Sequence, residues 1–265
     1  IVWDKINESK KKIVFIGDSY TQGACVKENE LISSYFDNYI TYNLGLDGNN
    51  PAIYSSLSKL FIPKIKPDFV VQLFYVNDFN EVNEDFFGKN LKVPNLEERY
   101  FKNSSSIELS NEILNIINNA KMIITEIPNR LPGERPNVLI RGARYLTLPT
   151  LRMYFSLIYN KYFFQLSSTT KYSMKILKET CLKNDCEPII GFITNSPYWE
   201  PNPLTETFKN QVKNFTSKNN IYFIDFTNEI NSLGDSARAP KGTHMSPAGY
   251  KIIADKIRGK LSDLN

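Results

Sequence analysis

The sequence predicts an α/β protein, a doubly wound sheet of five parallel strands with helices on both faces. Two observations lead to this fold class. Short runs of β-branched and aromatic residues are continuously apolar rather than alternating, which is typical of parallel strands buried on both faces. Helical patterns lie between these runs, so strands and helices alternate along the chain as they do in right-handed βαβ units.

The predicted elements follow in chain order. The strands are Lys12–Ile16, Tyr39–Asn43, Phe69–Phe74, Pro188–Thr194 and Ile221–Asp225. Helical patterns occupy Asn29–Asn38, Ala52–Ile62, Lys171–Asn184 and Leu204–Asn219. A last helix has Ser246 placed as its N-cap and Pro247 as its first residue. In that helix Ile253, Ile257 and Leu261 recur at helical spacing, so they are expected to face the core.

One segment does not fit this alternation. From about residue 80 to 170 the chain is far longer than a single crossover needs. It contains a helical pattern at Ile107–Ile117, a run at Met122–Ile127 that suits either a helix or a strand, and a stretch rich in Tyr and Phe at Leu151–Leu166. Because no repeat or low-complexity linker separates it, we expect one domain over 1–265 that contains a mostly helical insertion.

Composition limits the classes of function. The 265 residues include 32 Lys and Arg against 28 Asp and Glu, and the one tight basic run is Lys10–Lys12, so nucleic acid is not an expected partner. A single His and three Cys nearly exclude a multi-ligand zinc site, although not a site made of carboxylates. No run of about 18 apolar residues could cross a bilayer as a helix.

The cysteines and the N-terminus give weaker evidence on disulfides and localisation. Cys25, Cys181 and Cys186 are too few for a disulfide framework. Cys181 and Cys186 could pair across a helix end, but free buried thiols are the favoured interpretation. The chain begins with Ile1 and shows no signal peptide, as a mature or trimmed form would.

Polar residues follow the carboxyl ends of the predicted strands, where doubly wound sheets bind ligands. Gly17-Asp18-Ser19-Tyr20 follows the first strand, and Asn43-Leu44-Gly45-Leu46-Asp47-Gly48 begins with the last residue of the second. Asn77-Asp78 comes shortly after the third strand, and the only histidine, His244, stands between the fifth strand and the last helix. One edge of the sheet thus gathers a nucleophile, candidate oxyanion donors and a base.

Taken singly, each group has a simpler structural explanation. A serine after a strand more often caps a helix or a turn, and Asn77-Asp78 by itself is an ordinary turn. The glycines could serve only to give positive φ, and a histidine near a helix start is commonly structural. Purely structural roles would require four coincidences at one sheet edge, so the catalytic interpretation is favoured.

With these blocks in this order, the sequence resembles the SGNH (GDSL-like) hydrolases. The matching residues are Gly17-Asp18-Ser19 for the first block, Asn43 to Gly48 for the second, Asn77-Asp78 for the third, and His244 with Pro247 and Gly249 for the last. The resemblance implies a three-layer, flavodoxin-like SGNH hydrolase fold. It does not cover the insertion.

The resemblance also implies a role for each matched residue. Ser19 would be the nucleophile, and its own N–H would be one oxyanion donor. The N–H of Gly48, or of its neighbour Gly45, would be the second donor, and the side-chain amide of Asn77 the third. His244 would be the general base toward Ser19 and then the acid toward the leaving alcohol, since a serine hydroxyl is a poor nucleophile until a base accepts its proton.

Two positions depart from the family's pattern. An Asp commonly lies three residues before the histidine and orients it, but here that residue is Lys241, a cation that cannot accept the imidazole N–H. The orienting group would then be a backbone carbonyl or a carboxylate such as Asp235, while Asp225, at a strand end, is more often structural. In the third block Tyr75 and Val76 replace the small residues that commonly precede the Asn, which is expected to narrow the site.

The insertion has several open roles. Arg141, Arg144 and Arg152 lie in it beside many aromatic and aliphatic residues. A subdomain core packed on the sheet is the slightly favoured explanation. The alternatives are a lid or acyl-binding wall over the serine, a basic aromatic face that contacts a membrane surface, and aromatic rings that stack on sugars.

We therefore expect a serine hydrolase that cleaves an oxygen ester, either a carbohydrate O-acyl group or a short-chain ester, through an acyl-Ser19 intermediate. No metal or organic cofactor is expected, and the substrate would be a small-molecule or glycan ester. One alternative is an SGNH-type O-acyltransferase that modifies a cell-surface glycan. Another is a catalytically inactive binding module, which Lys241 favours. The resemblance favours the bacterial cell envelope or periplasm, with the cytoplasm left open.

Overall fold

The computed structural model describes residues 10–79, 158, 162, 164–195, 203–240, 242 and 244–264. The chain divides into two compact units, one made of residues 1–86 and 159–265 and the other of residues 87–158. The sheet and the candidate site residues at its edge belong to the first unit. The patterns predicted at Ile107–Ile117 and Met122–Ile127 lie outside the described residues, so the helical insertion stays a prediction.

Five strands form one parallel sheet in the order β2-β1-β3-β4-β5, the strand order of flavodoxin-like folds. The strands are β1 (Lys12–Ile16), β2 (Ile40–Asn43), β3 (Phe69–Tyr75), β4 (Glu187–Ile193) and β5 (Tyr222–Asp225). Every residue of the central strand β3 is buried, because helices cover both of its faces. The predicted strands are confirmed, each within one residue at either end.

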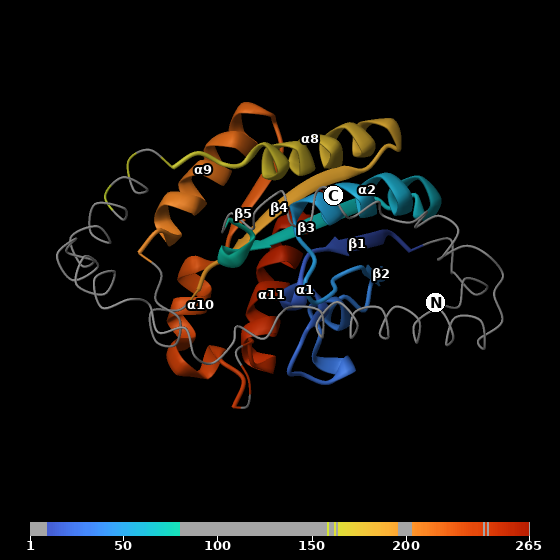
Figure 1. Ribbon diagram of the computed structural model, residues 1–265. Helices are drawn as coiled ribbons and strands as arrows, with labels where there is room; N and C mark the ends of the chain where they lie inside the picture. The colour runs from blue at the N-terminus through green and yellow to red at the C-terminus, as the bar shows by residue number, and fades with distance from the viewer. Residues whose placement is uncertain are drawn as a thin grey trace, which may run out of the picture. The chain divides into compact units, whose positions relative to one another are not determined.

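Helices cover the sheet on both faces (Figure 1). One face carries α2 (Pro51–Ile65), α8 (Ser168–Lys183) and α9 (Thr205–Lys218), and the other carries α1 (Ser19–Gln22), α10 (Thr227–Leu233) and α11 (Pro247–Leu264). This is the predicted three-layer α/β fold. Among the helices of the described part of the chain, none combines the length and the apolar character that crossing a membrane requires.

The last helix forms as its sequence predicts. The Ser246 hydroxyl accepts the backbone N–H of Gly249 at 3.2 Å, which caps α11. Ile253, Ile257 and Leu261 are completely buried on its inner face. Because the cap fixes where α11 begins, it also fixes the loop just before it, which carries the histidine.

The predicted helix Asn29–Asn38 is wrong. The segment instead forms two short 3₁₀ helices, η1 (Glu28–Glu30) and η2 (Ile32–Tyr35), on either side of an extended Leu31. The Ser34 hydroxyl donates to the Leu31 carbonyl at 2.7 Å. The backbone leaves the helical conformation at Leu31, whose φ of −67° and ψ of 155° are extended, and the apolar periodicity alone does not reveal such a break.

The remaining differences concern helix ends and short helices. α2 continues through Pro63 to Ile65, three residues beyond the predicted end. α8 begins at Ser168, three residues before the predicted start, because the Ser167 hydroxyl caps it by accepting the N–H of Thr170. The prediction lacks α1 and α10, because each is too short to show a helical repeat of apolar residues.

Candidate active site

The proposed nucleophile and base meet at the carboxyl edge of the sheet. Ser19 is the first residue of α1, directly after the turn that leaves β1. The Nε2 atom of His244 lies 2.8 Å from the Ser19 Oγ, although 225 positions separate the two residues in the sequence. This distance suits a hydrogen bond through which an imidazole can accept the serine proton. Ser19 is 5% exposed and His244 is half-buried.

The Gly-Asp-Ser turn has a structural basis at each residue. A Cβ at Gly17 would overlap the Thr21 hydroxyl, so a glycine is needed for α1 to turn back against β1. The Asp18 carboxylate accepts the N–H of Tyr20 at 2.9 Å and caps α1. The Ser19 hydroxyl is therefore presented by a short, capped helix rather than by a loose loop.

The second block supplies two glycines with different roles. The N–H of Gly45 donates to the Asn43 side-chain oxygen at 2.9 Å, so it is already engaged, and a Cβ at Gly45 would overlap the backbone of Gln22. Gly48 has a φ of +76° and faces open space at its Cβ position. Among the described residues, no hydrogen bond engages the Gly48 N–H. The Gly45 N–H is thus used within its own turn, and Gly48 stays the predicted backbone oxyanion donor.

Asn77 follows β3 within η3 (Val76–Phe79), and its amide is held in place. Its Nδ2 donates to the second oxygen of Asp18 at 3.2 Å. An amide NH₂ group has two hydrogens, so one can be bound by Asp18 while the other remains for a substrate oxygen. The Asp18 carboxylate thus links the cap of α1 to the candidate oxyanion donor Asn77.

The residue after Asn77 adds a second carboxyl, that of the half-buried Asp78. Asp78 accepts hydrogen bonds from the Tyr54 hydroxyl at 2.7 Å and from the Tyr75 N–H at 2.9 Å. Burial, and then the neighbouring Asp18 charge, raise the pKa of Asp78 well above its ordinary value. Burial also raises the pKa of Asp18, although the hydrogen bonds from Tyr20 and Asn77 oppose this shift.

Aromatic rings support the Ser–His pair. The Tyr20 ring stacks on Tyr75 at a centroid distance of 3.7 Å and lies 4.8 Å from the His244 ring. Tyr75 and Val76 are both buried. Tyr75, one of the two bulky residues that precede Asn77, is therefore packed beside Tyr20, the residue next to the nucleophile.

The structure does not bring Asp235 to the histidine. Asp235 is exposed in η4 (Gly234–Ala237), and its carboxylate makes no hydrogen bond or ion pair within the described part of the chain. A different side chain lies near Nδ1 of His244: the Sγ of Cys25 is 3.8 Å away. No motif in the sequence marks Cys25 for this position. Lys241 lies outside the described residues.

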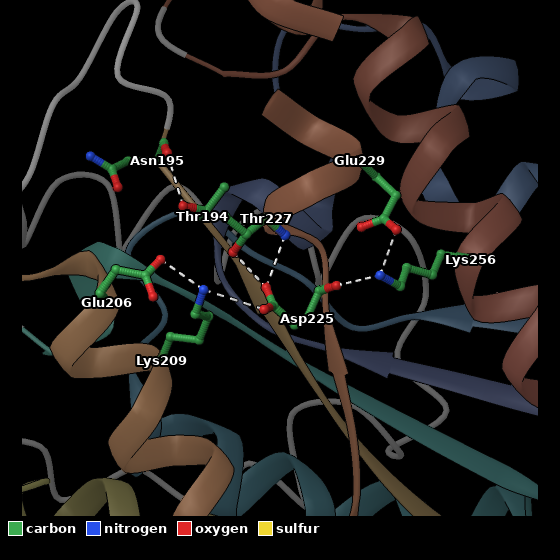
Figure 2. A network of polar contacts seen from close by, with 8 residues as sticks. All are labelled: Thr194, Asn195, Glu206, Lys209, Asp225, Thr227, Glu229 and Lys256. Carbon is green, nitrogen blue, oxygen red and sulfur yellow. Dashed lines mark hydrogen bonds and ion pairs between the residues drawn. The ribbon is translucent and has the colours of Figure 1, made fainter. Parts of the chain in front are cut away.

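Asp225 has the structural role that its place at a strand end predicts. Its carboxylate accepts the N–H of Thr227 at 2.9 Å and forms an ion pair with Lys209 at 3.4 Å, as Figure 2 shows. Burial alone would raise the pKa of Asp225, but Thr227 and Lys209 outweigh it and lower that pKa below its ordinary value. The Lys256 ammonium donates to the Asp225 carbonyl at 2.6 Å and pairs with Glu229. This network joins β5 to α9, α10 and α11.

No group of three or more His, Cys, Asp or Glu side chains is arranged to hold a metal ion in the described ranges. The site as described is a serine hydroxyl, an imidazole and nearby N–H donors. This set can activate an oxygen nucleophile and stabilise a developing oxyanion.

Residues 13–257 match the family described as GDSL-like Lipase/Acylhydrolase. No curated protein matches the chain.

Solved structures resemble the chain over nearly its full length. Their sequence identity to it is low, so the likeness shows the fold alone. A protein of the G-D-S-L family from Desulfitobacterium hafniense DCB-2, described as lipolytic, is 15% identical over 94% of this chain and 98% of its own, with a TM-score of 0.53. TesA is 10% identical over 96% of this chain and 100% of its own, with a TM-score of 0.53. The psychrotrophic esterase EstA from Pseudoalteromonas sp. is 9% identical over 96% of this chain and 98% of its own, with a TM-score of 0.50.

The family match covers both the sheet and the four sequence blocks at its edge. The chain therefore belongs to the GDSL-like lipase/acylhydrolase family and is an SGNH-type esterase.

Proposed function

We propose that this esterase cleaves an oxygen ester through an acyl intermediate on Ser19. The observation that supports the proposal is the 2.8 Å separation between the Ser19 Oγ and the His244 Nε2. A neutral imidazole at this distance can remove the hydroxyl proton as the oxygen attacks a carbonyl carbon.

The first half-reaction forms the acyl-enzyme. The Ser19 Oγ bonds to the ester carbonyl carbon and its proton moves to His244 Nε2, which leaves negative charge on the former carbonyl oxygen. The N–H groups of Ser19 and Gly48 and the amide of Asn77 are the proposed donors to that oxyanion. When the intermediate collapses, the bond to the alcohol oxygen breaks, and His244 returns the proton to the alcohol.

The second half-reaction releases the acid. A water molecule gives a proton to His244, its oxygen bonds to the acyl carbon, and the same donors hold the second oxyanion. Collapse breaks the bond to the Ser19 Oγ, which takes the proton back from His244. Nucleophile, base and donors are thereby restored to their starting protonation states.

The proposed substrate is a short acyl ester of a small molecule or a glycan. The support is the bulk of Tyr75 and Val76 at positions where the family commonly has small residues. Both side chains are buried, and Tyr75 packs on Tyr20 next to the nucleophile. Packed aromatic rings beside Ser19 leave less room for a long acyl chain.

The test compares wild type with Ser19→Ala on p-nitrophenyl esters from acetate to octanoate. We expect turnover to fall to background in Ser19→Ala, and wild type to prefer the shorter acyl chains. Ser56→Ala, which removes a hydroxyl on the exposed side of α2, is the matched control and should keep wild-type rates. Ser19→Ala with wild-type rates would contradict the proposal.

The two alternatives give different results in the same assay. An acyl-enzyme that is stable in water but is released quickly by an added alcohol would identify an acyltransferase. Failure of wild type to hydrolyse any ester, together with failure of Ser19 to react with a phosphonate probe, would identify a binding module.

A further inference from the structure

The turn after α1 holds a cysteine where a glycine is usual. The Val26 N–H donates to the Gly23 carbonyl at 3.4 Å and closes a four-residue turn. Its third residue, Cys25, has a φ of +74°, in the left-handed region. Type II turns place glycine or asparagine at this position, because other side chains crowd the backbone there. A cysteine held in this conformation suggests a function for its side chain.

The Cys25 side chain contacts His244, the proposed general base. Its Sγ lies 3.8 Å from Nδ1 of His244, on the opposite side of the ring from Nε2, which contacts Ser19. In the tautomer that leaves Nε2 free to accept the serine proton, Nδ1 bears the hydrogen. The sulfur is then placed to accept that N–H.

The surrounding chain is shaped to receive the sulfur. Gly242, in the loop before His244, has a φ of +105°, and a Cβ there would overlap the Cys25 Sγ. The Tyr250 hydroxyl donates to the Ala24 carbonyl at 3.4 Å, which ties the turn to α11. The cysteine turn and the histidine loop are therefore packed against each other.

We propose that Cys25 is a positioning residue for His244: its sulfur accepts the Nδ1–H and so directs the Nε2 lone pair toward Ser19. The role rests on the proposed function, in which His244 is the base for Ser19. It corresponds to the role of the Asp that the family commonly has three residues before the histidine, where this chain has Lys241.

The chemistry of sulfur predicts how substitutions behave. A neutral sulfur is a weaker acceptor than a carboxylate and stabilises an imidazolium less. Aspartate tolerates a positive φ better than most residues. Cys25→Asp therefore fits the turn and places a stronger acceptor near Nδ1, whereas Cys25→Ala removes the acceptor.

Kinetics on p-nitrophenyl acetate with the full chain provide the first test. Loss of one neutral hydrogen bond predicts a kcat roughly three- to tenfold lower in Cys25→Ala, with KM unchanged. Cys25→Asp should have a kcat at or above that of wild type. Cys25→Gly should lose kcat as Cys25→Ala does, yet have a higher Tm, because glycine relieves the positive φ. A cysteine with only a structural role would make kcat and Tm change in the same direction.

The second test needs no turnover. His244 is the only histidine, so its two ¹⁵N resonances are unambiguous. We expect the proton mainly on Nδ1 in wild type and in Cys25→Asp, and a larger Nε2–H population in Cys25→Ala. Identical tautomer populations in wild type and Cys25→Ala, with equal kcat, would overturn the role of Cys25. Ser19→Ala with wild-type rates would instead overturn the proposed function, whatever the tautomer populations show.

Discussion

Asn77→Ala removes one of the three donors proposed for the oxyanion, and the structure indicates how large the effect should be. The Asn77 amide is held by Asp18 at 3.2 Å, so it is oriented before the substrate binds. Losing one preorganised oxyanion donor typically costs about 2.7–4 kcal/mol, which corresponds to roughly a 10²–10³-fold lower kcat. KM should change little, because the donor faces charge that develops only in the transition state.

The assay measures kcat and KM on p-nitrophenyl acetate together with the free energy of unfolding. Asn184→Ala is the matched control. It removes an amide that donates to the Thr180 carbonyl at 2.8 Å at the end of α8, so it should lose stability but not kcat. A folded Asn77→Ala enzyme whose kcat lies within threefold of that of wild type would show that Asn77 is not an oxyanion donor.

A substitution at Asp18 tests the role of Asn77 in a second way. In Asp18→Asn, one of the two carboxylate oxygens becomes an NH₂ group, which would face the Asn77 amide or the Tyr20 N–H. We expect kcat to fall because Asn77 loses its orientation. The double variant should be little slower than Asn77→Ala alone, since residues that act through one another are not additive. Fully additive losses would show that Asp18 acts on the rate by another route.

Further predictions concern the rest of the site and its surroundings. Asp235→Asn should leave kcat within twofold of wild type, because the exposed carboxylate has no contact with His244 in the described structure; a loss of orders of magnitude would make it the orienting acid. Gly45→Ala should lower the free energy of unfolding by about 1–3 kcal/mol in chemical denaturation, because the added Cβ overlaps the backbone of Gln22. The raised pKa of Asp78 means that the folded state holds its proton more tightly, so this group's contribution to stability should decrease as pH rises above the ordinary carboxyl value. Asp225, with a lowered pKa, should contribute in the opposite sense, with stability lost on acidification. Unfolding of Asp78→Asn and Asp225→Asn at several pH values would show these slopes flattened, and unchanged slopes would contradict both assignments.

The Ser–His pair could be anticipated because the pattern that predicts the strands also locates their carboxyl ends. Ser19 and Asn77 follow adjacent parallel strands, so the sheet places them at one edge whatever the details of packing. Ser246 caps α11 and so fixes the position of the loop that carries His244. Asp225 was expected to be structural for the same reason, its place at a strand end, and its ion pair with Lys209 agrees.

Other features depended on interactions that the pattern does not contain. The helix predicted at Asn29–Asn38 is replaced by two 3₁₀ turns with a local bond from Ser34 to Leu31. Residue spacing likewise did not show that the Asn43 side chain accepts the Gly45 N–H. Both features are set by the local backbone conformation and its hydrogen bonds, which residue type and spacing leave open.

The parallel sheet, its helical layers and the edge at which a serine, an asparagine and a histidine gather could all be predicted from residue order. These follow from periodicity and from strand ends, which are properties of neighbouring residues along the chain. The contact between Cys25 and Nδ1 of His244 depends instead on tertiary packing. Cys25 and His244 are 219 positions apart, and their contact exists because the turn after α1 packs on the loop before α11. Such a contact depends on how distant segments fit together in space, so no local pattern could predict it.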